Sequence, residues 1–127
     1  MSDAALALQV ALCAALRVAG FDVFDGPPAD AALPYVTIGP DLVSDISTKT
    51  AARREHRYAV TVWAAADAVS AVKPAMAAVE AAVLAMPAAM GAYRLVTNDF
   101  VRSFTRADPA RGLVAGTCEF RARSEGA

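Results

Sequence analysis

Residues 57–63 read Arg-Tyr-Ala-Val-Thr-Val-Trp, and this stretch decides the class of fold. The apolar side chains of Tyr58, Val60 and Val62 alternate with their neighbours, a period of two residues that is typical of a half-buried β-strand. A second strand is indicated at residues 34–39, Pro-Tyr-Val-Thr-Ile-Gly, where proline stands at the start, a position that a strand tolerates. Together the two stretches predict a sheet with one buried face.

Apolar residues at helical spacing predict a first helix over residues 3–19. The stripe consists of Ala5, Leu8, Leu12, Ala15, Leu16 and Ala19, and it is widened by Leu6, Val10 and Cys13. Ser2 or Asp3 is the expected N-cap. Gly20 is the expected terminator of this helix, because glycine readily adopts the backbone conformation found after a helix end.

A second helix is predicted over residues 71–86. Its stripe consists of Val72, Met76, Val79, Val83 and Met86. Ser70 is the expected N-cap, because a helix that begins there places Pro74 among the first four N–H groups, which have no acceptor within the helix. Pro87 and Gly91 are expected to end the segment.

The remaining strands are predicted at residues 21–24, 93–106 and 113–123, the second of them bent or bulged. Residues 25–33 are expected to form a loop, and residues 108–112, Asp-Pro-Ala-Arg-Gly, have the composition of a turn. In the last strand every second residue is apolar, which places Cys118 and Phe120 on the inward face.

The order α-β-β-arm-β-α-β-β predicts an α+β fold, in which an antiparallel sheet of about four to five strands has two α-helices packed on one face. A length of 127 residues suits one domain. We therefore expect residues 1–127 to form a single domain, with an extended loop or hairpin arm at residues 40–57.

Alanine dominates the composition, with 32 of the 127 residues, so the hydrophobic content of 57% overstates the number of large core side chains. The net charge of −1 excludes a strong overall attraction to nucleic acid or to an anionic membrane. No apolar run reaches the roughly 20 residues that span a bilayer, so no membrane contact is expected. The charge is −5 over residues 1–48 and +4 over residues 49–127, an asymmetry that suits either chance or a protein that meets copies of itself.

No catalytic, cofactor or metal-binding motif rises above background, so the chain is not expected to be an enzyme, and no cofactor or metal ion is expected. His56 is the only histidine and stands among charged residues, where we expect a solvated arm. Cys13 and Cys118 are expected to be inward-facing thiols of low reactivity. The acidic residues within 41–47 lack the spacing of a calcium loop and suit turn capping.

Two features stand out from this background. The first is a basic stretch within the arm, formed by Lys49, Arg53, Arg54, His56 and Arg57. It is either a solvated strand edge or an interaction arm that docks on an acidic partner or on DNA phosphates. The second is Trp63, the only tryptophan, which is either an ordinary core residue or an interface anchor.

The sequence resembles the small tail completion proteins (tail terminators, or head–tail joining proteins) of long-tailed bacteriophages and phage-derived particles such as gene transfer agents and prophages. The resemblance rests on the order and spacing of residues 23–27, 33–39, 45–50, 60–64 and 120–123, which read VFDGP, LPYVTIG, DISTKT, VTVWA and FRAR.

This resemblance implies a structural virion protein that forms a ring, expected to be a hexamer, on the head-proximal end of the tail tube. The ring stops tube polymerisation and joins the tail to the neck, or stopper, protein of the head, while double-stranded DNA passes nonspecifically through its lumen. Such a subunit is made in the bacterial cytoplasm and ends in the tail or neck of the particle. The alternatives are another neck component, such as an adaptor or stopper, and a small ligand-binding or enzymatic α+β domain.

Overall fold

The computed structural model describes residues 3–24 and 32–126, which form two helices and six strands. In chain order these are α1 (Ala4–Val18), β1 (Val23–Phe24), β2 (Tyr35–Asp45), β3 (Arg53–Ala65), α2 (Val69–Leu84), β4 (Ala89–Met90), β5 (Tyr93–Asp108) and β6 (Leu113–Gly126). The loop expected at residues 25–33 lies mostly outside the described residues, as does Ser2, one of the two candidate N-caps of the first helix.

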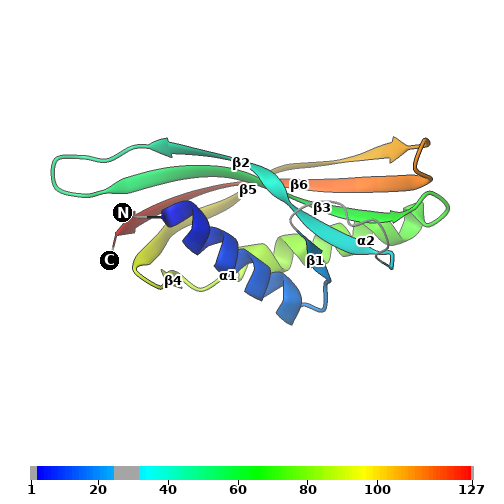
Figure 1. Cartoon of the computed structure of the whole chain (residues 1–127), viewed down its shortest axis with the longest axis horizontal. Helices are drawn as coiled ribbons and strands as arrows, with labels where there is room; N and C mark the ends of the chain where they lie inside the picture. The colour runs from blue at the N-terminus through cyan, green and yellow to red at the C-terminus, as the bar shows by residue number, and fades with distance from the viewer. Residues whose placement is uncertain (1–2, 25–31, 127) are drawn as a thin grey trace.

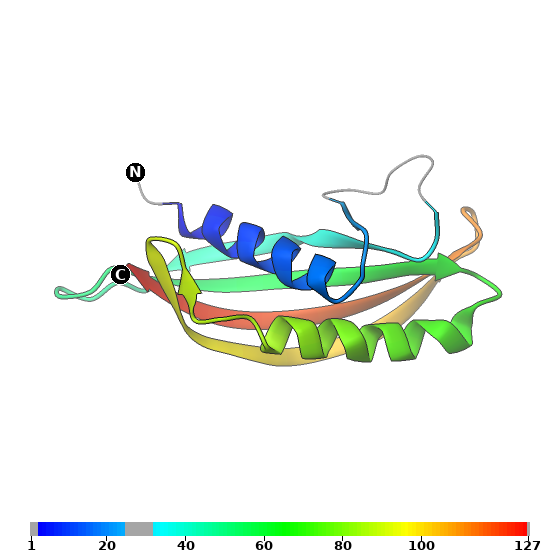
Figure 2. The same ribbon diagram turned by 90° about the horizontal axis from the view of Figure 1, so that it is seen from below.

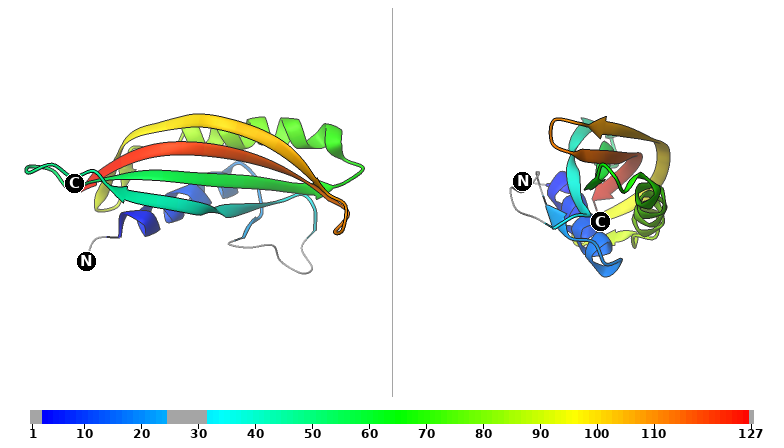
Figure 3. Two further views of the ribbon diagram at one scale, coloured as in Figure 1. Left: turned by 90° about the horizontal axis from the view of Figure 1, so that it is seen from above. Right: turned by 90° about the vertical axis from the view of Figure 1, so that its right-hand side faces the viewer.

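The six strands form one sheet in the order β1-β2-β3-β6-β5-β4 (Figure 1). The four long strands β2, β3, β6 and β5 pair antiparallel throughout. Both helices lie on the same face of this sheet (Figure 2), and the end-on view in Figure 3 shows the sheet curling round them. We call the uncovered side the helix-free face.

The expected α+β class and its two helices are confirmed, whereas the strand count and the purely antiparallel sheet are wrong. The sheet has six strands rather than four to five, and β1 pairs parallel to β2 through Val23 and Phe24. β4, which pairs with the start of β5, was not expected at all. β4 was missed because a strand of two residues is too short to show a period of two. The strand at residues 21–24 was expected, but its parallel direction depends on the path of the chain and leaves no mark in the local pattern.

Residues 40–57, expected as a loop or hairpin arm, belong to the ends of β2 and β3 and the turn that joins them. β2 and β3 stay paired as far as Asp45 and Arg54. The tip, residues 46–52, projects beyond the rest of the sheet at the end where β6 finishes (Figures 1 and 3). Hydrogen bonds order it: Asp45 Oδ1 accepts from the Ser47 N–H at 3.0 Å, and Ser47 Oγ accepts from the Arg53 N–H at 2.9 Å.

The two helices differ in how their first turns are satisfied. In α1, Asp3 Oδ1 accepts a hydrogen bond from the Leu6 N–H at 2.9 Å, which is an N-cap as expected. In α2 the expected Ser70 cap is wrong, because the helix begins at Val69 after Ala68, with no side-chain cap. Pro74 therefore lies beyond the first four positions and removes one backbone bond inside the helix.

The core lies between the helices and the covered face of the sheet. Its fully buried side chains include Leu12 and Leu16 from α1, Val79 and Val83 from α2, and Phe120 at the centre of β6. Alternation along β3 and β6 places every second side chain in this core, as the sequence predicted for Cys118 and Phe120. The small residues of α2 let the helix lie close to the sheet.

At Gly116 on β6, two side chains of α2 pack directly against the sheet. A Cβ added at this position would lie 2.8 Å from Val72 Cγ1 and would also collide with Met76 Sδ. Gly116→Ala is therefore expected to lower the free energy of unfolding by about 1–3 kcal/mol, as overpacked cores do. Urea unfolding measures the loss, and Gly126→Ala is the matched control, because nothing lies within 4 Å of its added Cβ. Equal stability of the two variants would contradict the close packing.

Candidate interaction surfaces

The basic residues of the arm do not form one surface, because alternation along β3 divides them between the two sides of the sheet. His56 and Arg54 are in phase with the buried Tyr58, so they face the helix side. Arg53 and Arg57 face the helix-free side, and Lys49 lies in the tip. The alternative of a solvated sheet edge is also wrong, since β3 is an interior strand flanked by β2 and β6.

Each arginine of this stretch already has an acidic partner. Arg53 pairs with Glu125 at 3.1 Å, Arg54 with Asp45 at 2.8 Å, and Arg57 with Glu55 at 3.5 Å. Within the described residues, Lys49 alone of the four cations of the arm has no ion pair. The positive charge of the arm is therefore largely balanced locally.

His56 contradicts the expectation of a solvated side chain, because only 1% of its surface is exposed. Its Nε2 lies 2.7 Å from Ser124 Oγ, and its Nδ1 has no hydrogen-bond partner among the described residues. Burial lowers the pKa of His56 below its ordinary value of 6.5; Arg54 lowers it further, while Asp41 opposes the shift. His56 is therefore a buried imidazole that is uncharged at neutral pH.

The lowered pKa of His56 makes stability depend on pH. The unfolded chain takes up the proton first as the pH falls, so the stabilisation is complete above about pH 6.5 and is lost below it. The slope from this single group is at most about 1.4 kcal/mol per pH unit. Urea unfolding between pH 7.5 and 5.5 measures it, and His56→Gln is expected to flatten the curve. A wild-type stability that rises toward pH 5.5 would contradict this assignment.

Trp63 is half-buried on the helix-free face, at the end of β3 away from the arm. Its ring stacks on Tyr35 with centroids 6.5 Å apart, and its Nε1–H donates to Thr37 Oγ1 at 2.9 Å. The guanidinium of Arg111 lies 5.3 Å from the ring centroid. Trp63 thus has partners within the chain, and its role as an interface anchor stays a prediction.

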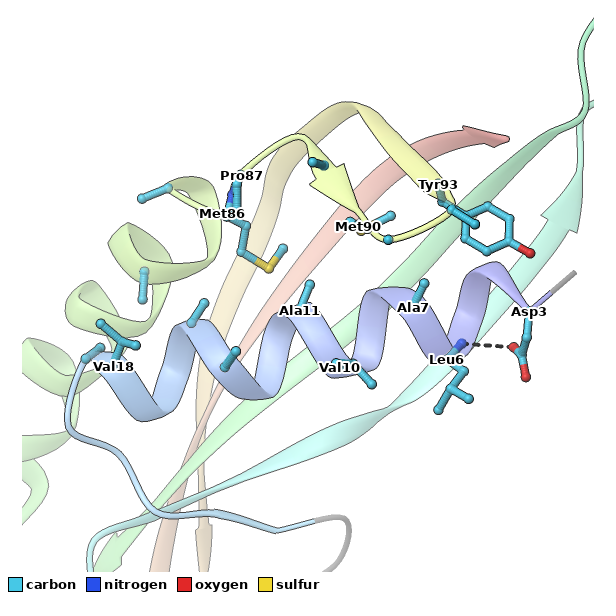
Figure 4. A pocket seen from close by; sticks show the side chains of 18 residues that line it. Asp3, Leu6, Ala7, Val10, Ala11, Val18, Met86, Pro87, Met90 and Tyr93 are labelled. Carbon is cyan, nitrogen blue, oxygen red and sulfur yellow. Dashed lines mark hydrogen bonds between the residues drawn. The ribbon is translucent and has the colours of Figure 1, made fainter. Parts of the chain in front are cut away.

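An apolar groove that we had not predicted runs along α1 (Figure 4). Its volume is about 840 Å³, and it lies between α1 and residues 82–93, which end α2 and lead into β5. Leu6, Val10 and Val18 line it with 55%, 61% and 90% of their surfaces exposed. Small side chains form most of the remaining lining.

The groove left a signal in the sequence. Leu6 and Val10 widen the apolar stripe of the first helix beyond the width that one buried face needs. Leu8, Leu12 and Leu16 fill the core side of α1, so the widened part is left on the outside. An exposed apolar surface of this kind is typical of a site that another protein covers.

Within the described residues, the side chains that could bind a metal ion or act in catalysis do not cluster. No three histidine, cysteine or acidic side chains gather there as a metal site would require. Burial raises the pKa of the Cys118 thiol to about 11, with a smaller contribution from Glu80, so the thiol stays protonated at neutral pH. Neither described helix is long and apolar enough to cross a bilayer.

Comparison with known proteins gives this arrangement a family. The model of the family "Tail completion protein gp17" matches residues 4–125. A solved chain from the "Virion of native gene transfer agent (GTA) particle" is 34% identical, with a TM-score of 0.74, over 91% of this chain and 84% of that one. No curated protein sequence matches significantly. The chain belongs to the tail completion protein gp17 family, and it is a structural protein of phage-like tails rather than an enzyme.

Proposed function

We propose that this chain is a tail terminator, which assembles as a hexameric ring on the head-proximal end of the tail tube. The ring ends tube polymerisation, binds the stopper protein of the neck and lets double-stranded DNA pass through its lumen without reading bases. The observation that carries this proposal is the 34% identity to a chain of a gene transfer agent virion, over 91% of this chain and 84% of that one.

The isolated subunit has the surfaces that such an assembly needs. The α1 groove exposes Leu6, Val10 and Val18, and the arm tip projects past the sheet with no part in the core. A single chain that stays alone gains nothing from these features, whereas a ring buries them against a neighbour, the tube or the neck. The asymmetric charge of the two parts of the sequence suits heterologous contacts between unlike faces.

Particles made without this protein test the proposal directly. Electron microscopy is expected to show tails of excessive and variable length, together with heads that carry no tail. Tails of normal length that stay detached from heads would instead assign the protein to another part of the neck, such as the stopper or adaptor. Intact particles of normal length would overturn the proposal.

A further inference from the structure

Two sheet edges remain without a partner strand in the described residues. β1 covers β2 only at Val36 and Thr37, so β2 is open from residue 38 to its end. β4 covers β5 only at Tyr93 and Arg94, so β5 is open from residue 96 to its end. A long unpaired edge is a template for another strand, and natural proteins seldom leave one uncovered.

The backbone donors of both edges point outward from the sheet. The Val36 N–H donates to the Asp22 carbonyl at 2.8 Å, on the side away from β3. Alternation and the register with β3 then place the N–H groups of Asp41 and Val43 on the same open side. The second open edge is that of β5. There the Leu95 N–H donates to the Ala88 carbonyl at 2.7 Å, on the side away from β6.

The register of β5 with β6 shows which later N–H groups of β5 also point away from β6. Its two irregularities, between Leu95 and Thr97 and between Phe100 and Arg102, each add one residue on β5. After them, alternation aims the N–H groups of Ser103 and Thr105 at the open edge. Residues 102–108 pair with β6 without interruption, so this part of the edge is regular.

We propose that the open edge of β5, residues 102–107, pairs antiparallel with the open edge of β2, residues 41–45, of a second copy of this chain. The inference rests on the proposed ring and specifies how its subunits join. Repeated at every subunit boundary, the pairing closes the sheets of all copies into one continuous barrel. Such a contact is heterologous, and closure of the ring leaves no edge of this kind free.

The sheet has the polarity that this pairing requires. Its four long strands alternate in direction, so β2 and β5 run opposite to each other. A rotation about the ring axis keeps the strand directions relative to that axis, and it therefore brings β5 of one copy beside an antiparallel β2 of the next. Within one sheet, residues 41–45 of β2 are level with residues 95–100 of β5, so pairing with residues 102–107 also requires strands that are tilted to the ring axis, as they are in closed barrels. An odd number of long strands would make this contact parallel.

The proposed pairing also places side chains of the same face opposite each other. Val43 on β2 and Thr105 on β5 both face the helix side, since they are in register with His56 and with Gly116. Residues that exchange hydrogen bonds across a ladder share a face. Pairing Asp41 and Val43 with Ser103 and Thr105 thus keeps the helices of all copies on one side and the helix-free faces on the other.

Both edges carry apolar side chains that a neighbour would cover. Leu42 on β2 is 62% exposed and Val43 is 36% exposed, while Phe104 on β5 is 39% exposed. Beside the β5 edge, a hollow of about 400 Å³ is lined on its helix side by Lys73 and on its strand side by Ser103. The hollow offers space for a helix-side residue of the neighbouring β2. Lys73 and Glu80 both line it, so its charges balance and it is the space rather than the charge that suits a neighbouring strand.

Proline substitution on the edge strand tests the proposal. Thr105→Pro removes an N–H that points to the open edge, so we expect the melting temperature to stay near wild type while ring formation, measured by native mass spectrometry and on capped tails, is lost. Phe104→Pro removes a donor to β6 and is expected to unfold at lower temperature. Thr105→Val keeps the donor and is expected to keep the ring. A Thr105→Pro protein that assembles like wild type would overturn the proposal.

Cysteine pairing between copies gives a readout that does not depend on folding losses. Ser44 faces the helix-free side, so Ser44→Cys is combined in turn with Arg102→Cys, Phe104→Cys or Arg106→Cys, which sample the possible registers. Oxidation of assembled protein is expected to give a ladder of linked chains for one of these pairs. Ser44→Cys with Arg121→Cys, on the same face of the interior strand β6, is the control and is expected to give no ladder.

The outcomes separate this inference from the proposed function. Rings that terminate tails but never cross-link through these pairs would refute the edge pairing and leave the terminator role standing. Normal particles in the absence of the protein would refute the terminator role. A ladder from the control pair together with none from the edge pairs would place the subunit boundary on the helix-free face instead.

Discussion

Phe120→Ala is expected to lower the free energy of unfolding by about 3–5 kcal/mol, as the removal of a buried aromatic ring does elsewhere. Phe120 is 1% exposed at the centre of β6. Its ring stacks on Tyr58 with centroids 5.4 Å apart, and it meets the edge of Phe100 at 6.0 Å. Since a domain of this size is stable by about 5–15 kcal/mol in all, the variant approaches the limit of folding.

Chemical denaturation of purified protein measures this loss, and two neighbours calibrate it. Phe120→Leu keeps most of the volume and is expected to lose less. Arg121→Ala changes the next residue, which faces the opposite side of the sheet, and is expected to stay within about 0.5 kcal/mol of wild type. If Arg121→Ala costs as much as Phe120→Ala, the core does not lie on the covered face.

The period and spacing of apolar residues were enough to predict the long strands and the helices, because each repeats its pattern several times. Tyr58, Val60 and Val62 mark β3, and the leucines of the first helix mark the face that α1 buries. These signals are robust because a strand or helix of a dozen residues repeats its pattern several times. β4 repeats nothing, so pairing alone defines it, and the parallel direction of β1 is likewise a property of the folded chain.

The sequence contained the information needed to predict that His56 is buried, but the pattern was interpreted wrongly. Its neighbours in the sequence are charged, which suggested solvent, yet it is in phase with Tyr58, and the phase of a strand decides which side a residue takes. The same phase divides Arg53 from Arg54. Reading the alternation through the charged stretch would have predicted both the burial of His56 and the division of the basic residues.

The widened stripe of the first helix indicated an exposed apolar surface, but the shape of the α1 groove and the two open edges could not be predicted from this sequence alone. The groove depends on how far residues 82–93 stand from α1, a distance that packing between elements sets. The edges depend on the strand order, which places β2 and β5 on either side of the pair β3 and β6. The alanine-rich composition did indicate small surfaces suited to close approach, and the groove lining agrees with that expectation.

The arm tip is the remaining feature whose size exceeds any need of the fold. No residue of 46–52 belongs to the core cluster, yet hydrogen bonds order the turn. Ion pairs balance the arginines at its base, so a partner gains little from their charge in water. We therefore expect the tip to act through its shape, as a rigid projection that meets another protein of the particle.

Replacing residues 47–52 by Asn-Gly is expected to leave the melting temperature close to wild type and to reduce the yield of joined particles by about tenfold or more, equivalent to about 1.4 kcal/mol of lost binding. The change is compatible with the fold, because the Ile46 N–H already donates to the Arg53 carbonyl at 3.1 Å, and Asn-Gly closes a two-residue hairpin at such a pair. Lys49→Gln is the matched control. It removes the one cation of the arm that has no ion pair in the described residues, and it leaves the shape intact.

Three results divide the possibilities for the arm. Loss of joining in the shortened variant together with normal joining in Lys49→Gln assigns the contact to the projecting backbone and its small side chains. Equal loss in both variants assigns it to the charge of Lys49 and favours an acidic partner. Normal joining in the shortened variant contradicts an interaction arm altogether, and the contacts that place the subunit in the particle then lie on the α1 groove and the sheet edges, which the replacement does not touch.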